Sequence, residues 1–294
     1  MLRSILITAL VVTVFSFSTR SEAASLTVSP GRFIVHDVEP GRNYDLYKET
    51  GLRLTIINES EESQTWLLKT FQPSGRGRWE KAYGEIPDAR WCWFTEEEIT
   101  VDAKSIGYAH VNMLIPGGEK YYNQHWVATL NISGKPGEGG IGLAVDVRMQ
   151  IETQSKSDIE VRPAGLIGMK PSIVRFEEVV PGTIHEATVT LFNNDDIAHS
   201  YSVTSLFDDI EINRAKYLTQ SYSEMPDRVW LSGRDTIRID AGGTAELDLK
   251  LKVPEDTTHF GKKWEDMILI QPDRGRAAFV RVQVETAAGP DTKD

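Results

Sequence analysis

The sequence predicts an all-β fold, with two tandem immunoglobulin-like β-sandwich domains after a signal peptide. Three observations predict it. Short stretches of alternating apolar and polar residues are separated by turn residues. A set of landmarks recurs once along the chain, and an apolar N-terminal segment ends in small residues. Helical periodicity is nearly absent, and residues 212–221 are the one segment where a helix is expected to be possible.

The landmarks divide the 294 residues into two copies of one unit. The segment PDARW ending at Trp91 matches PDRVW ending at Trp230, an offset of 139 (230 − 91), and Trp126 matches Trp264 at an offset of 138 (264 − 126). This period is too long for a solenoid, so it indicates duplication of a whole domain. The other matching pairs are Ser29-Pro30 with Lys170-Pro171, Pro40-Gly41 with Pro181-Gly182, Ile115-Pro116 with Val253-Pro254, and Glu152-Thr153 with Glu285-Thr286.

Alternating segments between the landmarks predict matching strands in both copies. Residues 52–57 end in the turn residues 58–60, and their counterpart 187–192 ends in 193–196. About seven strands in each copy fit an immunoglobulin-like topology. The other predicted strands span residues 111–115, 144–151, 247–253 and 279–284.

Domain boundaries follow from these landmarks and from composition. The polar stretch at residues 154–162 is typical of a short linker, which predicts limited hinge freedom between the domains. The predicted segments are a signal peptide at 1–23, a first sandwich at 24–153, a linker at 154–165, a second sandwich at 166–287 and a disordered tail at 288–294.

The N-terminal segment has the three parts of a secretory signal. Arg3 is the basic residue, residues 5–17 are apolar, and Ser21 and Ala23 fit the −3 and −1 positions of a cleavage site. We expect cleavage after Ala23, and an uncleaved anchor is the alternative. The mature chain is then periplasmic or secreted and does not insert into a membrane.

Charge and cysteine usage narrow the class of partner. The net charge of −11 argues against nucleic acid and anionic lipid, because both require a basic surface. Cys92 is the only cysteine, so no intrachain disulfide forms and stability depends on core burial. Its position between two tryptophans on a predicted strand indicates a buried thiol rather than a nucleophile.

No catalytic constellation stands out, so we expect no enzyme activity, no cofactor and no metal. The sequence has no Gly-x-Ser-x-Gly motif, and its histidines form no short-spaced pair with each other or with Cys92. The glycine-rich segment 134–140 contains a proline and precedes a strand, which favours a hairpin loop over a phosphate loop. Calcium at the acidic segments 193–196 and 208–211 is the alternative to ordinary turns.

Tryptophans separate framework residues from candidate binding residues. Trp91, Trp126, Trp230 and Trp264 occur in both copies and are expected in the cores. Tryptophans confined to the first copy are better candidates for a surface, and one of them lies in a basic, aromatic segment at 75–83. The surface candidates are Trp66, Trp79 and Trp93, and that segment adds Arg76, Arg78 and Tyr83 as candidate binding residues.

The opening of each copy resembles bacterial surface domains of the DUF916 and major-sperm-protein-like immunoglobulin class. In the first copy, the resemblance runs from Val28-Ser29-Pro30 through Pro40-Gly41 to Asn58. It covers about a third of each domain. The resemblance implies an immunoglobulin-like fold.

The chain also resembles periplasmic pilus-assembly chaperones, which are two-domain immunoglobulin-like proteins. Arg32 near the first strand and Arg148 near the domain link carry this resemblance, together with Arg162-Pro163. The family holds a subunit's C-terminal carboxylate with a cleft Arg and Lys, and an edge strand completes the subunit's fold. The resemblance implies these roles for Arg32 and Arg148, with Arg148 in place of the family's Lys.

Together these features predict an exported, non-catalytic binding, scaffold or assembly protein of the cell envelope. Its expected partner is an envelope or surface protein, or cell-wall material. The alternative is a periplasmic chaperone of the pilus or fimbrial type that binds subunits by β-strand addition and carboxylate capture.

Overall fold

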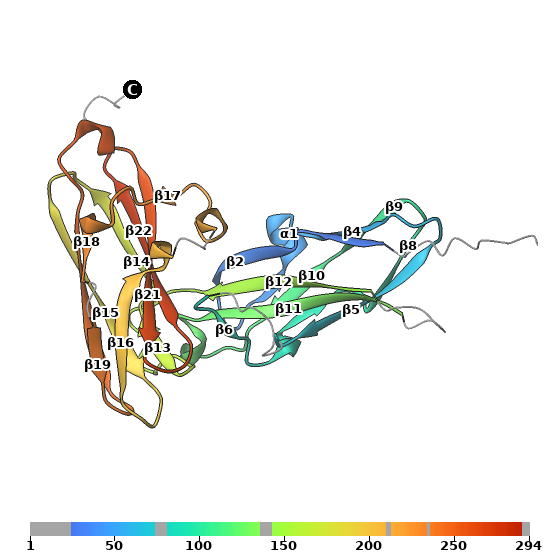
Figure 1. Ribbon diagram of the computed structural model, residues 1–294, viewed down its shortest axis with the longest axis horizontal. Coiled ribbons are helices and arrows are strands. Elements are labelled where there is room, and N and C mark those ends of the chain that lie inside the picture. The colour runs from blue at the N-terminus through green and yellow to red at the C-terminus, as the bar shows by residue number, and fades with distance from the viewer. Residues whose placement is uncertain (1–24, 74–80, 136–142, 210–212, 234–235, 290–294) are drawn as a thin grey trace, which may run out of the picture.

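The computed structural model describes residues 25–73, 81–135, 143–209, 213–233 and 236–289. The predicted signal peptide lies outside these residues. The described chain forms two immunoglobulin-like β-sandwiches, and one end of the first meets the side of the second with their long axes in different directions (Figure 1). The predicted fold class is therefore confirmed.

The first sandwich packs a six-stranded sheet, ordered β2-β12-β11-β5-β8 with β6 beside β11, against two three-stranded sheets, β1-β4-β9 and β3-β10-β7. Its strands are β1 (Leu26–Ser29), β2 (Arg32–Val38), β3 (Asn43–Asp45), β4 (Leu54–Asn58), β5 (Gln64–Phe71), β6 (Gly84–Glu85), β7 (Cys92–Phe94), β8 (Glu98–Val101), β9 (Ser105–Ala109), β10 (Val111–Leu114), β11 (His125–Gly134) and β12 (Ala144–Thr153).

The second sandwich packs a four-stranded sheet, β13-β15-β20-β18, against a six-stranded sheet ordered β14-β22-β21-β16-β19, with β17 beside β21. Its strands are β13 (Ile167–Lys170), β14 (Ile173–Val179), β15 (Ile184–Asn193), β16 (His199–Ser205), β17 (Ser223–Glu224), β18 (Leu231–Ser232), β19 (Thr236–Ile239), β20 (Thr244–Lys252), β21 (Lys263–Pro272) and β22 (Ala278–Thr286).

Each copy begins with a strand that changes sheets. In the first copy β1 pairs antiparallel with β4, the chain passes the cis Ser29–Pro30 bond, and β2 then pairs in parallel with β12. The second copy repeats this with β13 on β15, the cis Lys170–Pro171 bond, and β14 parallel to β22. The two halves therefore share the same strand crossing at their start.

A buried asparagine occupies the same place in both copies. Asn58, at the end of β4, is fully buried, and its Nδ2 donates to the carbonyls of Glu62, Val101 and Asp102 at 2.8–3.0 Å. Asn193, at the end of β15, donates in the same way to three carbonyls at 2.7–3.2 Å. Each asparagine satisfies buried backbone acceptors where a strand ends, so it closes the turn that follows.

The repeated tryptophans pack as expected. Trp126, Trp230 and Trp264 are buried, and Trp91 packs partly buried against the first core. The Trp91 and Trp126 rings meet edge to face with centroids 5.6 Å apart, and the Trp230–Trp264 pair repeats this geometry at 5.2 Å. Cys92 is also buried, as predicted, and burial raises the pKa of its thiol to about 12.

Other expectations need correction. Trp66 is 1% exposed, because its position on β5 faces the first core, so it is not a surface residue. A helix, α1 (Leu46–Thr50), lies where none was predicted, since five residues are too few to show helical periodicity. Asp45 caps its N-terminus and Gly51, at φ +74°, ends it.

The short helical turns elsewhere are all 3₁₀. The segment in which a helix was considered contains one such turn, because Pro226 and polar residues surround it. No helix among the described residues is both long enough and apolar enough to span a bilayer. The 3₁₀ turns are η1 (Ala89–Trp91), η2 (Glu119–Tyr121), η3 (Leu206–Asp208), η4 (Arg214–Lys216), η5 (Arg228–Trp230) and η6 (Thr257–His259).

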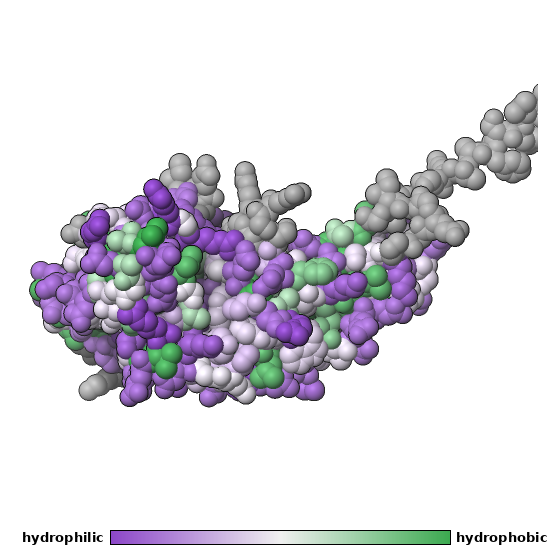
Figure 2. Space-filling model, turned by 90° about the horizontal axis from the view of Figure 1, so that it is seen from below, coloured by the Kyte–Doolittle hydropathy of each residue, from purple (hydrophilic) through white to green (hydrophobic). Residues whose placement is uncertain are grey.

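The surface seen from below is largely hydrophilic, and its hydrophobic residues form small separate groups (Figure 2). Isolated apolar side chains of this kind are ordinary for a folded chain. A binding surface must therefore be found from specific side chains and open strand edges rather than from bulk hydrophobicity.

Replacing either buried asparagine should destabilise the protein. Asn58→Ala and Asn193→Ala each leave several buried carbonyls without a donor, which costs about 2–3 kcal/mol in the free energy of unfolding. Urea denaturation followed by tryptophan fluorescence measures the loss. Asn112→Ala, on the surface of β10, is the control and should change stability by no more than about 0.5 kcal/mol. Equal effects of all three substitutions would contradict this role.

Candidate functional site

The second domain covers part of the outer face of the first domain's six-stranded sheet. Along β12, Val147, Met149 and Ile151 point into the first core, so the alternate residues face outward. Two of these outward residues, Gln150 and Glu152, are nevertheless completely buried. This covered area is the domain junction.

A buried arginine joins the two domains at the centre of the junction. Arg281, on β22 of the second domain, donates through Nε to Glu152 Oε2 at 3.1 Å and through Nη2 to Glu152 Oε1 at 2.6 Å. Its Nη1 bonds Glu265 and the Tyr217 carbonyl. Tyr83 donates its hydroxyl hydrogen to Glu152 from the first domain. We call Arg281, Glu152, Glu265 and Tyr83 the junction cluster.

The surroundings fix the charge state of the junction cluster. Burial alone would raise the pKa of Glu152, but Arg281 and the nearby His36 hold it well below its usual range. Burial raises the pKa of Tyr83 well above its usual range, so Tyr83 stays neutral. Burial also lowers the pKa of His125 to about 4, so this histidine is uncharged at neutral pH.

Apolar contacts surround the junction cluster. The His125 ring, at the start of β11, stacks on Phe279 of β22 with centroids 3.8 Å apart and planes 4° apart. Ion pairs lie at the rim: Lys81 with Asp209, Arg276 with Glu85, and Arg175 with Asp37. The buried apolar residues of this contact are Ala82, Tyr83, Val127, Leu206, Phe207, Tyr217, Met267, Leu269 and Phe279.

Asn123 fastens the link between the domains to the first sandwich. Its Oδ1 accepts hydrogen bonds from Ser155, Lys156 and Ser172 at 2.9–3.2 Å, and its Nδ2 donates to the Lys156 carbonyl at 2.7 Å. Asn123 has φ +60°, a conformation that asparagine tolerates better than most residues. These hydrogen bonds hold the link against the first sandwich.

The two arginines that the chaperone resemblance singles out lie side by side. Arg32 on β2 and Arg148 on β12 are direct partners in the parallel register and share the outer face of the sheet. The Arg32 guanidinium lies 5.7 Å from the Tyr217 ring centroid, and Arg148 Nη1 donates to Thr129 Oγ1 at 3.2 Å. The pair therefore lies at the boundary between the part of the sheet's outer face that the second domain covers and the part that it leaves open.

An open strand edge lies directly beside this pair. β12 pairs with β11 along its length, but β2 pairs with it only from Arg148 onward. Among the residues that the structure describes, no strand pairs with the other side of residues 144–147. Gln150, two positions past Arg148, is buried with no hydrogen-bond partner for its amide within the described chain. Stability alone does not account for such a group.

The remaining predicted site residues do not gather at one place. Tyr83 is 1% exposed in the junction cluster, which corrects its expected role in a surface loop: its ring packs on Phe279 of the second domain. Trp93 is partly exposed on β7, on the opposite sheet from the arginine pair. Arg76, Arg78 and Trp79 lie outside the described residues.

Sequence analysis missed an exposed aromatic face on the first domain. Arg53 lies 3.7 Å from the Tyr108 ring centroid and 5.7 Å from that of Tyr47, and Tyr47 stacks on His110 at 4.6 Å. Tyr47, Tyr108, Ile106 and Trp93 are all exposed. We call these residues, with Arg53, His110 and the intervening Asn112, the aromatic face.

The second copy carries charged and small residues at the same positions. Tyr108 pairs with Thr55 as Glu246 pairs with Thr190, and Trp93 pairs with Asn112 as Ser232 pairs with Lys250. The fold therefore does not require aromatic side chains here. By this register, Ile106, Tyr108, His110, Asn112 and Trp93 correspond to Thr244, Glu246, Asp248, Lys250 and Ser232.

The acidic loops considered for calcium have other partners. Asp195 and Asp273 hold the two ring nitrogens of His199 at 2.9 and 2.7 Å. Asp208 pairs with Arg228, and Asp209 pairs with Lys81. Within the described ranges, no three His, Cys, Asp or Glu side chains gather as they would around a metal ion.

No protein-family model matches this sequence, and no curated protein matches it. Solved structures similar to it include a Porphyromonas gingivalis W83 protein of unknown function, with 13% identity over 88% of this chain and 99% of that chain and a TM-score of 0.35. They also include the E. coli chaperone DraB, with 10% identity, 90% and 97% coverage and a TM-score of 0.30.

A C. elegans member of the MSP family has 16% identity, covering 42% of this chain and 100% of that chain, with a TM-score of 0.26. Both classes that the sequence resembles are thus present among the similar structures. At these identities and scores, the likenesses do not bear on function.

Replacing Arg281 should destabilise the junction strongly. Arg281→Met leaves Glu152 and Glu265 buried without their cation, which costs about 3–5 kcal/mol in the free energy of unfolding. Arg276→Met removes an arginine that also pairs with a glutamate across the junction, but that pair is exposed and its loss should cost no more than about 1 kcal/mol. Chemical denaturation measures both. Similar losses for the two variants would show that the buried cluster has no special role.

Proposed function

We propose that this chain is a non-catalytic protein-binding module of the cell envelope, and that it holds an extended partner segment along the open edge of β12. The observation that carries this proposal is the position of that edge. Within the described ranges, no strand pairs with one side of residues 144–147, and this edge runs directly into the Arg32–Arg148 pair.

An extended segment added at this edge satisfies backbone groups that are otherwise open. Its main-chain hydrogen bonds supply affinity, and side chains on alternate positions supply specificity. Val145 and Val147 point toward the first core, so the added strand would extend the six-stranded sheet without disturbing its inner face. Binding here needs no catalytic group.

The arginine pair suits an anionic end of the same segment. Two guanidinium groups on neighbouring strand positions can both donate to one carboxylate, and each can do so with two parallel hydrogen bonds. This is the mode that the resemblance to pilus-assembly chaperones implies. A C-terminal carboxylate of an envelope or surface protein is the partner group we propose.

The rigid junction supports this mode of binding. Tyr217 reaches Arg32 from the second domain, and its carbonyl accepts a hydrogen bond from Arg281 of the junction cluster. The orientation of the domains is thereby tied to the surroundings of the arginine pair. A surface held in place before binding loses less entropy when the partner arrives.

Cross-linking tests the open edge. A photoreactive benzoylphenylalanine at Ala144 should join a discrete partner protein in the cells of origin, and the yield should fall at least tenfold (about 1.4 kcal/mol) when Arg32 and Arg148 are both changed to alanine. The same group at Lys250, on the exposed face of β20, is the control and should give no such adduct. The proposal fails if the yield at Ala144 is insensitive to the arginine substitutions.

The aromatic face favours a second function, that of a scaffold or adhesion module. Arg and aromatic side chains are the types that anchor protein interfaces, and here they replace the charged residues of the second copy. Arg53 lies between two exposed tyrosines, and no carboxylate among the described residues pairs with it. A partner surface with an acidic side chain between apolar ones would complement this face.

The second copy supplies the variant that tests this second function. Ile106→Thr, Tyr108→Glu and Trp93→Ser together graft its surface onto the first domain. Each substitution should change stability by no more than about 0.5 kcal/mol, because the fold already accepts these residues. Recovery of envelope partners on the immobilised variant should fall at least tenfold (about 1.4 kcal/mol). Glu246→Ala is the control, and unchanged recovery by the triple variant would exclude this face.

A further inference from the structure

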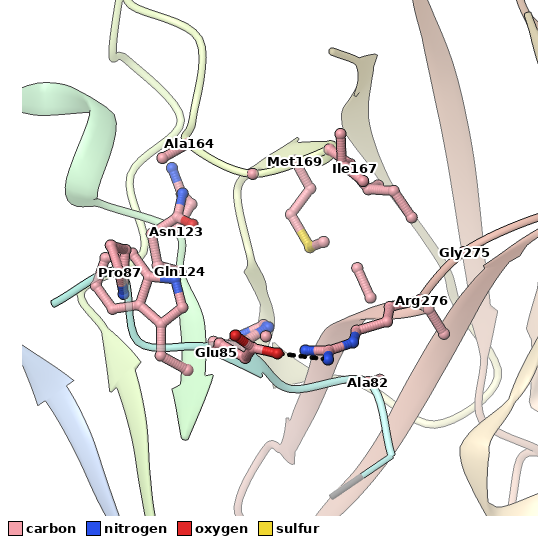
Figure 3. A pocket seen from close by; sticks show the side chains of 17 residues that line it. Ala82, Glu85, Pro87, Asn123, Gln124, Ala164, Ile167, Met169, Gly275 and Arg276 are labelled. Carbon is pink, nitrogen blue, oxygen red and sulfur yellow. Dashed lines mark hydrogen bonds and ion pairs between the residues drawn. The ribbon is translucent and has the colours of Figure 1, made fainter. Parts of the chain in front are cut away.

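A cavity of about 410 Å³ lies between the two domains, beside the junction cluster. Residues 82–87 and 123–126 of the first domain form one side of it, the link and β13 form another, and the hairpin between β21 and β22 forms the third (Figure 3). This volume falls within the range of sites that bind small molecules, and such sites often lie between domains.

Most of the cavity wall is apolar. Met169 and Ile167 project from β13 toward the space opposite Glu85 and Ala82, and the Arg276 side chain crosses the near side (Figure 3). Water molecules in a space of this kind make few hydrogen bonds to the protein, because few wall groups offer them. The apolar wall residues are Ala82, Pro87, Trp126, Leu166, Ile167, Met169, Ala277 and Ala278.

Nearly all polar side chains on the wall already have partners. Glu85 and Arg276 pair with each other at 2.7 Å, which is the dashed contact in Figure 3. Asn123 is committed to the link, and the Gln124 amide donates to the carbonyls of Lys120 and Tyr122. A charged ligand would therefore find no uncommitted counter-charge on this wall.

His125 is the exception. This wall residue is 8% exposed, and neither ring nitrogen has a hydrogen-bond partner among the described residues; Nε2 is fully buried, so Nδ1 is the nitrogen that a ligand can reach. Its low pKa keeps the ring neutral, so one nitrogen donates and the other accepts. An unpartnered, reachable ring nitrogen on an otherwise apolar wall is the arrangement that a ligand with one hydrogen-bonding group would complete.

We propose that this cavity binds a small, neutral, aromatic molecule that carries a hydroxyl or carbonyl group, with His125 as its hydrogen-bonding partner. The ring occupies the apolar space between Met169 and Trp126, and the polar group reaches the imidazole. Because the wall belongs to both domains, the bound molecule also strengthens the junction.

Calorimetric titration with methyl 4-hydroxybenzoate tests the proposal. We expect a Kd below about 1 mM for this neutral ester. The matching acid, 4-hydroxybenzoate, should bind at least about tenfold more weakly, because its carboxylate would lose water without gaining a cation. The melting temperature should rise with the ester and not with the acid. Absence of ester binding at 5 mM (roughly fivefold above the expected limit) overturns the proposal.

Two variants connect binding to the cavity. His125→Phe keeps a ring stacked on Phe279 and removes the hydrogen-bonding nitrogens, so affinity for the ester should fall about tenfold. Ala164→Phe places a ring in the cavity from the link and should abolish binding. Ala288→Phe, an exposed position outside the cavity, is the control and should bind normally.

The alternatives give different results. Equal ester binding by Ala164→Phe and the parent protein would place the molecule elsewhere and overturn the proposal. If N-acetylphenylalaninamide binds about tenfold more tightly than the ester, the cavity receives a side chain of a protein partner, and the small-molecule assignment is wrong. Preference for the ester supports it. None of these measurements depends on the open edge of β12.

Discussion

The rest of the structure depends on the contact between Arg281 and Glu152. Both side chains are withdrawn from water, and they come from different domains. Such a pair adds little net stability when its desolvation is counted, so the apolar contacts around Phe279 must supply most of the binding free energy. The pair instead determines how the two domains are oriented against each other. Any docking that buried Arg281 or Glu152 without its partner would carry a large penalty, which favours the orientation in which the two meet.

Duplication explains how this contact arose from one domain's residues. Arg148 and Glu152 hold the same strand positions as Arg281 and Glu285, because β12 and β22 share their parallel register with β2 and β14. The first copy keeps its arginine at the edge of the junction, and the second copy keeps its glutamate at the surface, paired with Lys263. The junction therefore pairs Glu152 of the first copy with Arg281 of the second, and these two are the buried members of the four residues. The equivalent residues are of the same type in both copies, and they differ in whether the junction buries them.

The fold was predictable because its signals are local or repeated. Alternating strands, the buried asparagines and the paired tryptophans all occur in short segments that recur in both copies. The junction has no such signal: Glu152 recurs as Glu285 in the repeat, but nothing in either segment connects it with Arg281, which lies 129 residues away. Tyr83 was misplaced for the same reason, since its partner Phe279 belongs to the other domain. The aromatic face could have been found by comparing Tyr108 with Glu246.

Charge gives the proposed surfaces a means of discrimination. The chain carries a net charge of −11, so its overall field repels acidic proteins at long range. Arg32, Arg148 and Arg53 are local exceptions, and each lies beside a surface that exposes backbone or aromatic groups. A partner that is neutral or basic overall, but presents one carboxylate, satisfies both conditions. A uniformly acidic partner does not meet the first condition, and a partner without a carboxylate does not meet the second. Selectivity therefore comes from the difference between the negative charge of the whole chain and the local positive charge of the arginines.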